Sequence, residues 1–331
     1  MMEEQSSPVL IVGTGAMASL FAARLASSGI QVKMLGTWLE SIQTLNESGV
    51  RLTDKDGSEK IYPIKATQDP QECAESRFAI VLVKSYQTRR VAEQLKSCLA
   101  NDGLALTLQN GLENDTTLAA VLGEDRVSIG VTTIGATLIE PGWVRYGGDG
   151  IITLTQHARV NPLRDILTQS GFLVETVEDA ESLVWGKLVV NAAINPLTAL
   201  LRIPNGELVR RPSAHTLMNL VAQETANVAA AIGVHLPYSD PVSVVESVAE
   251  RTASNKSSML KDVLRGSPTE IDAINGAIVT IGERKNVPVQ LNRILWLLIN
   301  AIDRTENFQG KNSIANEGDF QPEFAAARWQ G

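Results

Sequence analysis

The sequence has few cysteines, only Cys73 and Cys98 among its 331 residues. Two cysteines cannot form the dense disulfide framework of a small secreted domain, and their spacing matches no cysteine-based metal site. We therefore expect no disulfide scaffold, no bound metal and a reducing compartment, the cytoplasm.

Positive charge is also scarce, because 29 Lys and Arg residues stand against 37 Asp and Glu residues, for a formal net charge of −8. Proteins that bind nucleic acid neutralise phosphates with clustered Lys and Arg, and this sequence has no basic block. A nucleic-acid partner is not expected.

Long hydrophobic runs are absent as well. Apolar stretches such as "ILWLLINAI" (294–302) fall short of the roughly 20 residues that cross a bilayer. The start, "MMEEQSSPVLIVG", is acidic before its apolar run, whereas a secretory signal begins with a positive segment. We expect neither a membrane span nor export.

The length and the hydrophobic pattern predict two domains, because single domains usually have about 100–200 residues. Residues 8–36 indicate a strand, a glycine turn, a helix and a second strand, which is one βαβ unit. The apolar runs 78–85 and 103–111 are typical of buried parallel strands. Strands from Val127 to a last one at 172–179 are expected to complete the same sheet. The predicted fold is α/β, with a Rossmann-type dinucleotide-binding domain at 8–178.

Beyond Asp179 the strand pattern gives way to helical periodicity. We predict an all-α substrate domain at 179–308 and a polar tail of uncertain order at 309–331. The expected helices are 181–194, 213–233, 240–253, 269–286 and 290–304.

The stretch "VGTGAMAS" follows the first strand and opens the first helix. Gly13, Gly15 and Ala18 give the pattern G-x-G-x-x-A, in which the glycines allow a tight turn and a close pyrophosphate, and the small third residue lets helix pack on strand. The glycines could instead simply form a turn. The strand and helix on either side favour dinucleotide binding, with the cofactor-binding residues Gly13, Thr14, Gly15, Ala16, Met17 and Ala18.

The choice between NAD and NADP is set near the end of the second strand, where an acid favours NAD and an arginine favours NADP. Here the sequence reads "MLGTWLES", with Thr37 and Trp38 at those places. Neither residue decides the preference. Trp38 could lie against an adenine or pack locally in its loop.

A polar stripe interrupts the apolar run 183–208, with Lys187, Asn191 and Asn195 four residues apart. In a helix these side chains share one face. Burial of an unpaired charge costs several kcal/mol, so the stripe is either a solvated face or the wall of a polar cleft. Pro196 is expected to end the helix at this cleft.

A second unusual stretch, "SNKSSMLKDVLRGSPTEIDAING", spans 254–276 and contains the hydroxyl pair Ser257–Ser258. Ser267 and Glu270 match a capping box, which gives Glu270 a structural role at a helix start. Alternatively, Glu270 faces the polar stripe, where a carboxylate would hold a lysine charged and oriented.

Together these segments resemble the ketopantoate reductases, also called 2-dehydropantoate 2-reductases. The resemblance covers residues 10 to about 280 and includes the glycine turn, "VKSYQT", "LQNGLEN", "WGKLVVNAAINPLTAL" with "PNGEL", and "NKSSMLKDVLRGSPTEIDAINGAIV". It implies NADPH-dependent reduction of ketopantoate to (R)-pantoate in pantothenate and coenzyme A biosynthesis. It also implies a helical domain of the 6-phosphogluconate-dehydrogenase C-terminal type and a small-molecule partner. The oligomeric state stays open between monomer and homodimer.

The resemblance implies roles for the polar residues of the second half. Lys187 resembles the catalytic lysine that polarises and protonates the ketone, with Glu270 as its acidic partner. Ser258 resembles the serine that binds the substrate carboxylate. Substrate-binding amides are implied for Asn110, Asn191, Asn195, Asn205 and Asn255.

The resemblance also implies a cofactor set beyond the glycine turn. Asn110 would touch nicotinamide as well as substrate, Ala136 is a small residue beside the cofactor, and Glu270 lies near its ribose. Lys84 matches a lysine on the NADP side of the cleft. Thr37 stands where many members carry an arginine for the 2′-phosphate, so NADP(H) rather than NAD(H) is expected from the family alone.

Two other functions fit parts of the pattern. A related enzyme could reduce another branched 2-oxo acid, or act as an opine-type or glycerol-phosphate-type dehydrogenase. A protein that senses a dinucleotide and regulates a partner without chemistry would need only the glycine turn. The stripe with Ser258 favours the ketopantoate interpretation.

Overall fold

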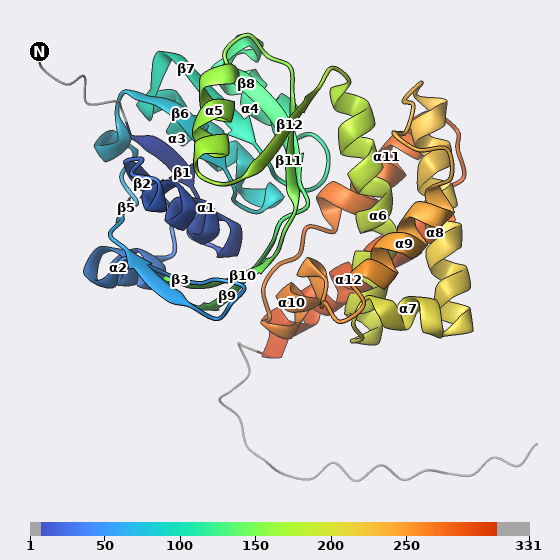
Figure 1. The fold of residues 1–331 in the computed structure, drawn as a ribbon. Coiled ribbons are helices and arrows are strands. Elements are labelled where there is room, and N and C mark those ends of the chain that lie inside the picture. Colours follow the sequence, from blue (N-terminus) through green and yellow to red (C-terminus); the bar gives the residue numbers. More distant parts are fainter. Residues whose placement is uncertain (1–7, 310–331) are drawn as a thin grey trace, which may run out of the picture.

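The computed structural model describes residues 8–309, so the predicted tail from residue 310 onward lies outside the described residues. The chain forms a half that contains the sheets and a half that is helical (Figure 1). Helix α6 (Ala180–Leu201) begins the helical half, and Asp179 caps it by accepting a hydrogen bond from the Ser182 N–H.

The main sheet has eight strands, and its order places β1 between β6 and β2. Neighbouring strands are parallel except for the antiparallel pair β8–β11. From edge to edge the strands are β12 (Leu173–Val177), β11 (Ile151–Thr155), β8 (Val127–Thr132), β7 (Leu99–Thr107), β6 (Ser76–Val81), β1 (Val9–Val12), β2 (Val32–Leu35) and β5 (Lys65–Thr67).

Two apolar cores cover the faces of this sheet, because side chains alternate along each strand. Val9 and Ile11 of β1 join the core formed with α1 (Ala16–Ser27) and α5 (Asn161–Gln169). Leu10 and Val12 join the core with α3 (Thr88–Cys98) and α4 (Asn114–Leu122). The remaining helical segments of this half are α2 (Leu39–Ser48), η1 (Pro70–Cys73), η2 (Ser85–Gln87) and η3 (Glu124–Arg126).

The prediction that all strands after Val127 complete one sheet is wrong for two of them. A separate four-stranded sheet has the order β4 (Glu59–Tyr62), β3 (Val50–Thr53), β10 (Trp143–Gly148) and β9 (Gly135–Glu140). The sequence pattern identifies a strand but not its partner, and β10 pairs with β3, far away in the chain. Strands β8, β11 and β12 do join the main sheet.

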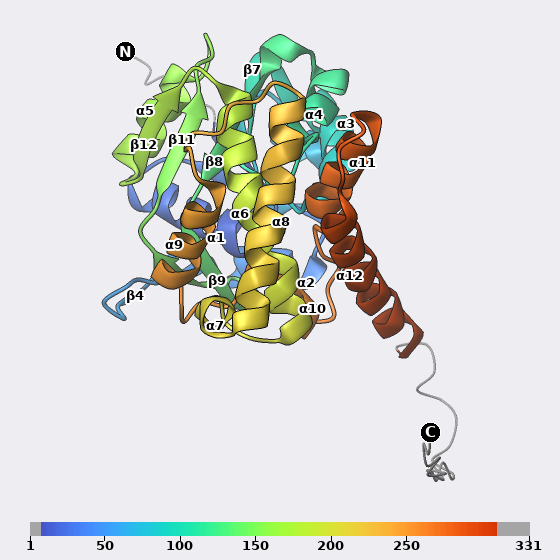
Figure 2. The ribbon, with the colours of Figure 1, turned by 90° about the vertical axis from the view of Figure 1, so that its right-hand side faces the viewer.

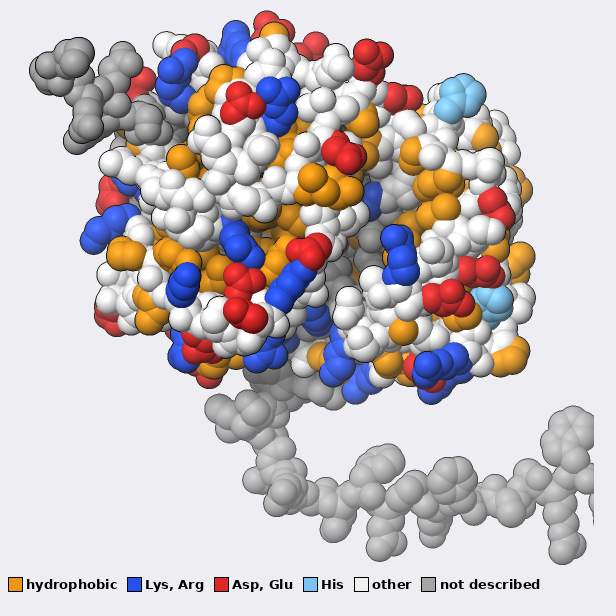
Figure 3. Space-filling model, in the orientation of Figure 1, with side chains coloured by type: hydrophobic (Ala, Val, Ile, Leu, Met, Phe, Trp, Pro, Cys, Tyr) orange, Lys and Arg blue, Asp and Glu red, His pale blue; other side chains and the backbone are white. Residues whose placement is uncertain are grey.

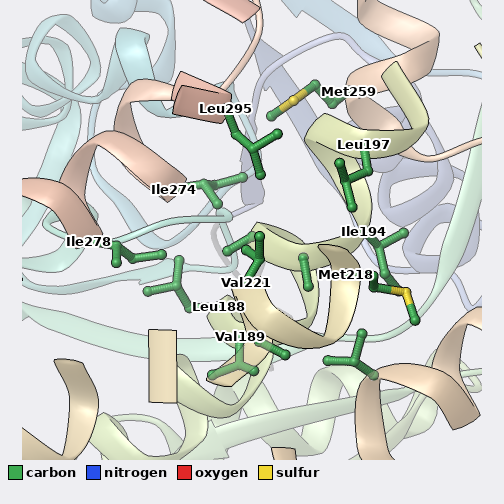
Figure 4. Packing of buried hydrophobic residues seen from close by; sticks show 14 of the residues in the cluster. Leu188, Val189, Ile194, Leu197, Met218, Val221, Met259, Ile274, Ile278 and Leu295 are labelled. Atoms are coloured by element: carbon green, nitrogen blue, oxygen red, sulfur yellow. The ribbon is translucent and has the colours of Figure 1, made fainter. Parts of the chain in front are cut away.

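The helical half packs around α6. Side chains of α6 and of the helices that follow it meet in one apolar core (Figure 4). The elements after α6 are α7 (Gly206–Arg210), α8 (Pro212–Ala231), α9 (Pro241–Arg251), α10 (Ser258–Leu264), the π-helical turn η4 (Asp272–Gly276), α11 (Ala277–Arg284) and α12 (Gln290–Gln309). Helices α6 and α8 lie side by side (Figure 2).

Helix α6 departs from two expectations. It has 22 residues and is apolar enough to cross a membrane by length and composition, yet 67% of its apolar window is buried inside the molecule, as in a core helix of a soluble protein. Pro196 does not end it, because the helix continues to Leu201 and closes at Arg202, which has a left-handed φ of 54°. The carbonyl of Ala192, which a proline at 196 leaves without its helical donor, accepts a hydrogen bond from the Asn275 amide at 3.2 Å.

The face of the molecule drawn in Figure 3 shows basic side chains interspersed with acidic ones, and hydrophobic side chains between them. Among residues 8–302, no group of three or more His, Cys, Asp or Glu side chains is arranged to hold a metal ion.

Candidate active site

The strand order of the main sheet marks where a ligand would bind. The chain runs from β1 to β2 on one side of β1 and returns to β6 and β7 on the other. In open α/β sheets, ligands bind at the carboxyl ends of the strands where the order reverses. The glycine turn follows β1 at this point, Lys84 follows β6, and Asn110 follows β7.

The glycine turn has the geometry of a phosphate cradle. Gly13 has a φ of +123°, and a Cβ there would approach the backbone of Leu82 to 3.3 Å. Gly15 caps α1 without a side chain, no acid stands in the first turn, and nothing lies within 4 Å of a Cβ placed on Gly15. The helix N-terminus is therefore open, and a pyrophosphate fits against its N–H groups. Thr14 and Ala18 are buried beside it, and Ala16 and Met17 begin the helix.

Thr37 and Trp38 lie just beyond β2. Thr37 is exposed, and its carbonyl accepts a hydrogen bond from the Gln68 amide at 3.0 Å. Trp38 is 40% exposed and stands at the N-cap of α2. The side chain at position 37 supplies neither an arginine fork nor a carboxylate for the ribose.

Glu270 is one of the residues through which the two halves of the molecule meet. Its carboxylate is buried and accepts hydrogen bonds from the Ser85 N–H and from the Asn110 side-chain amide, each at 3.2 Å. Both donors belong to the half that contains the sheets: Ser85 begins η2, and Asn110 lies in the loop after β7. Of the two hypotheses for Glu270, these contacts favour a carboxylate that lies between the two halves over the helix cap.

Lys84 lies between two carboxylates of the helical half. Its ammonium is 2.5 Å from the Asp262 carboxylate and 3.7 Å from that of Glu270. Burial alone would lower the pKa of Lys84, but the attraction of Glu270 and Asp262 outweighs burial, and the pKa is raised. Burial raises the pKa of Asp262, and Lys84 offsets part of that rise. Lys84 is therefore a fixed cation at neutral pH.

Lys187 has the opposite character. It projects from α6, is half-buried, and donates a hydrogen bond to the carbonyl of Thr132 at the end of β8 at 2.9 Å. Burial lowers the pKa of Lys187 to about 8, although the Glu270 carboxylate acts to raise it. A lysine with this pKa can release a proton near neutral pH.

The polar stripe on α6 is not a solvated face. Lys187 and Asn191 are half-buried, and Asn195 is buried. Asn205, between α6 and α7, is also buried and donates from its amide to the Thr252 hydroxyl at 2.8 Å. Its side-chain oxygen has no hydrogen-bond partner within the described chain, which leaves an acceptor available.

Ser257, the N-cap of α10, and Ser258, its first residue, have different surroundings. Ser257 is buried, accepts a hydrogen bond from the Leu260 N–H, and receives one from the Thr198 hydroxyl of α6 at 2.7 Å. Ser258 and Asn255 are exposed. The Asn255 carbonyl accepts from the Asn205 N–H at 3.0 Å, so these two predicted substrate residues are neighbours in the backbone.

Ala136 lies in β9 and is half-buried. The next residue, Thr137, accepts a hydrogen bond from Lys261 of α10 at 3.0 Å, and Arg265 donates to the Leu138 carbonyl at 2.8 Å. These two bonds join the α10 region to β9, so Ala136 lies near the junction of the two halves.

Sequence reasoning missed three groups in this region. Asp262 is the nearest partner of Lys84, and its position in the same motif as Ser258 was the available signal. The Ser85 N–H and the Thr132 carbonyl are backbone groups, so their side-chain identities gave no hint of their contacts with Glu270 and Lys187.

Two family descriptions match the chain. "Ketopantoate reductase PanE/ApbA" matches residues 9–159, and "Ketopantoate reductase PanE/ApbA C terminal" matches residues 179–303. The 2-dehydropantoate 2-reductase of Archaeoglobus fulgidus is 37% identical over 303 residues, which cover 89% of this chain and 97% of that protein. The protein of the same name from Halobacterium salinarum is 34% identical and is covered to 99%.

The chain belongs to the ketopantoate reductase family. This membership confirms the resemblance, the predicted fold class and the expectation of an oxidoreductase that acts on a CH–OH group.

Solved structures agree with this assignment. A ketopantoate reductase of Ralstonia eutropha superposes with a TM-score of 0.85 at 32% identity, covering 91% of this chain and 99% of that one. D-mandelate dehydrogenase, solved with NADH and anilino(oxo)acetate, superposes with a TM-score of 0.86 at 26% identity and the same coverage. A nicotinamide dinucleotide is the cofactor that these comparisons indicate.

Proposed function

We propose that the protein reduces 2-dehydropantoate to (R)-pantoate with NADPH, in the cytoplasm, as a step of pantothenate and coenzyme A biosynthesis. The observation that supports this most directly is Lys187. Its pKa is lowered to about 8 and is sensitive to the charge of Glu270, whose carboxylate also accepts from the Asn110 amide.

The reaction adds a hydride to the ketone carbon and a proton to the ketone oxygen. A bound nicotinamide supplies the hydride. Lys187 stabilises the negative charge that develops on the oxygen and transfers its proton there, so the product is a hydroxyl and the lysine becomes a neutral amine. The amine then regains a proton from solvent, and Glu270 favours its charged form.

The proposed substrate-binding residues suit an anionic substrate that also carries a hydroxyl group. Asn191, Asn195 and Asn205 can bind hydroxyl and carboxylate oxygens without adding a charge that competes with Lys187. Ser258 and Asn255 stand exposed at the start of α10, where they can reach the substrate carboxylate.

The cofactor residues are the glycine turn Gly13–Ala18, Thr37, Lys84, Asn110, Ala136 and Glu270. The turn accounts for the pyrophosphate. The preference for NADP(H) comes from the family, because Thr37 itself provides no partner for a 2′-phosphate.

A second candidate is the reduction of another 2-oxo acid with NADH. It is favoured by the fold shared with D-mandelate dehydrogenase, which was solved with NADH, and by the missing arginine at position 37.

A rate assay separates the two candidates. The full chain is incubated with NADPH or NADH and with ketopantoate, 2-oxoisovalerate or benzoylformate, and absorbance at the nicotinamide band is followed. We expect the highest kcat/KM for ketopantoate with NADPH. A higher value for benzoylformate with NADH would replace the first function with the second, and tight cofactor binding without turnover would indicate a sensing protein.

A further inference from the structure

The proline inside α6 creates a local defect in the helix. Each carbonyl of an α-helix normally accepts from the N–H four residues later, and a proline at 196 removes the donor for the carbonyl of Ala192. Ala192 is fully buried, so water cannot replace that donor at low cost. The defect lies between Asn191 and Asn195, two of the residues proposed to bind substrate.

Asn275 satisfies this carbonyl from a different element. Its side chain is fully buried in η4, and its amide nitrogen donates to the Ala192 carbonyl at 3.2 Å and to the Asn292 side-chain oxygen at 2.9 Å. Both amide hydrogens are therefore used.

The orientation of the Asn275 amide is fixed by its neighbours. The Asn292 amide donates to the Glu224 carboxylate at 2.8 Å, so Asn292 must present its oxygen to Asn275. The opposite orientation of Asn275 would place two oxygens against each other at both contacts. The bonds thus link α8, α12, η4 and α6 in one chain.

The same turn also bonds to Glu270 and to the segment after Asn110. The Ile274 N–H donates to the Glu270 carbonyl at 3.1 Å, and the Gly276 N–H closes the π-type bond to the Ile271 carbonyl at 3.0 Å. The Ala273 carbonyl accepts from the Leu112 N–H at 3.0 Å, two residues after Asn110. Asn275 therefore connects the turn that positions Glu270 and Asn110 with the defect in α6.

We propose that Asn275 is a positioning residue that sets the polar face of α6 against Glu270. It acts through the carbonyl that Pro196 leaves free, and it touches neither substrate nor cofactor in this role. The inference rests on the proposed function of Lys187, Asn191 and Asn195.

A double-mutant cycle tests the route of this effect. Asn275→Ala removes the donor, whereas Pro196→Ala restores an N–H that can bond to the Ala192 carbonyl within the helix. We expect Asn275→Ala to lower kcat/KM for the 2-oxo acid by about tenfold or more, with the loss mainly in kcat. In the Pro196→Ala background, the same change should cost less than about threefold, because the carbonyl no longer needs Asn275.

Asn300→Ala is the matched control. The Asn300 amide also donates from α12 to η4, and its acceptor is the Asp272 carboxylate at 3.2 Å. Unlike the buried contacts of Asn275, this acceptor is an exposed side chain. It should leave kcat/KM within about twofold. Lower thermal stability of Asn275→Ala with unchanged kcat and KM would overturn the positioning role, and so would an equal loss of kcat/KM in both backgrounds.

The cycle stays informative if Asn275→Ala does not fold. The double variant should then fold and turn over, and its failure to fold would contradict the proposed route. Wild-type chain without activity on any 2-oxo acid would contradict the proposed function instead. In that case the melting temperature would test the link from Asn275 to α6. Asn275→Ala should lower the melting temperature by more in the native background than in the Pro196→Ala background.

Discussion

Glu270 and Asn110 belong to different halves of the molecule, and the Asn110 amide donates to the Glu270 carboxylate at 3.2 Å. This carboxylate acts to raise the pKa of two lysines, but their net pKa shifts are opposite. Lys84, which also pairs with Asp262, has a raised pKa, whereas burial dominates at Lys187 and lowers its pKa to about 8. One lysine is therefore a permanent cation, and the other is suited to proton transfer.

The pH dependence of reduction should follow Lys187. Its protonated form is the proton donor, and this form is lost as pH rises through a pKa of about 8, so kcat for reduction should fall above that pH. Glu270→Gln removes the charge that raises this pKa, so the decline should begin at lower pH. The measurement is kcat between pH 6 and 10, and an unchanged profile in the variant would contradict the coupling.

Substitutions of the neighbouring serines Ser257 and Ser258 should have different effects, one on stability and the other on substrate binding. Ser258→Ala is expected to raise KM for the 2-oxo acid about tenfold with little change in melting temperature, because the hydroxyl is exposed. Ser257→Ala removes a helix cap and a bond to Thr198, so it should cost about 1–2 kcal/mol of unfolding free energy. Equal effects of the two changes on KM would contradict the assignment of Ser258.

The ion pair between Lys84 and Asp262 should contribute more to stability and to cofactor binding than an exposed ion pair does. Asp262→Asn leaves Lys84 with Glu270 alone at 3.7 Å, so we expect a lower melting temperature and a KM for cofactor raised several-fold. Asp102→Asn makes the same change in the exposed pair with Arg77 and should cost less than about 1 kcal/mol. Similar losses in both variants would show that the interdomain pair has no special role.

Cofactor choice should respond to position 37. Thr37→Arg supplies a guanidinium at the end of β2, so KM for NADPH should fall several-fold while KM for NADH stays nearly constant. Gln43→Arg, on the exposed side of α2, adds the same charge and should not discriminate between the cofactors. An equal response to both cofactors in Thr37→Arg would place the 2′-phosphate elsewhere.

Much of the fold could be predicted from the sequence because its signals are local. The βαβ unit with Gly13 and Gly15 appears as expected, and the second half is helical. The second sheet could not be foreseen, since the pairing of β10 with β3 depends on the assembled fold. Pro196 misled the prediction of α6 for a similar reason, because the carbonyl that it leaves without a helical donor is bonded by Asn275, 79 residues further along the sequence.

The candidate site was predictable in its side chains but not in its backbone contacts. The spacing of Lys187, Asn191 and Asn195 indicated one polar face, and the structure shows that face half-buried or buried, with Lys187 bonded to the Thr132 carbonyl of the sheet-containing half. The alternative roles of Glu270 could be separated only by its contacts with Ser85 and Asn110, because a capping box and a cleft carboxylate look the same in sequence.

The most direct test compares the wild-type chain with Lys187→Ala in the reduction of ketopantoate by NADPH, with cofactor affinity measured by fluorescence in both. We predict that kcat falls by about 10²–10⁴-fold, the usual contribution of a positioned general acid, while the Kd for NADPH stays within about threefold. Turnover of Lys187→Ala at the wild-type rate would contradict the central claim that this lysine delivers the proton.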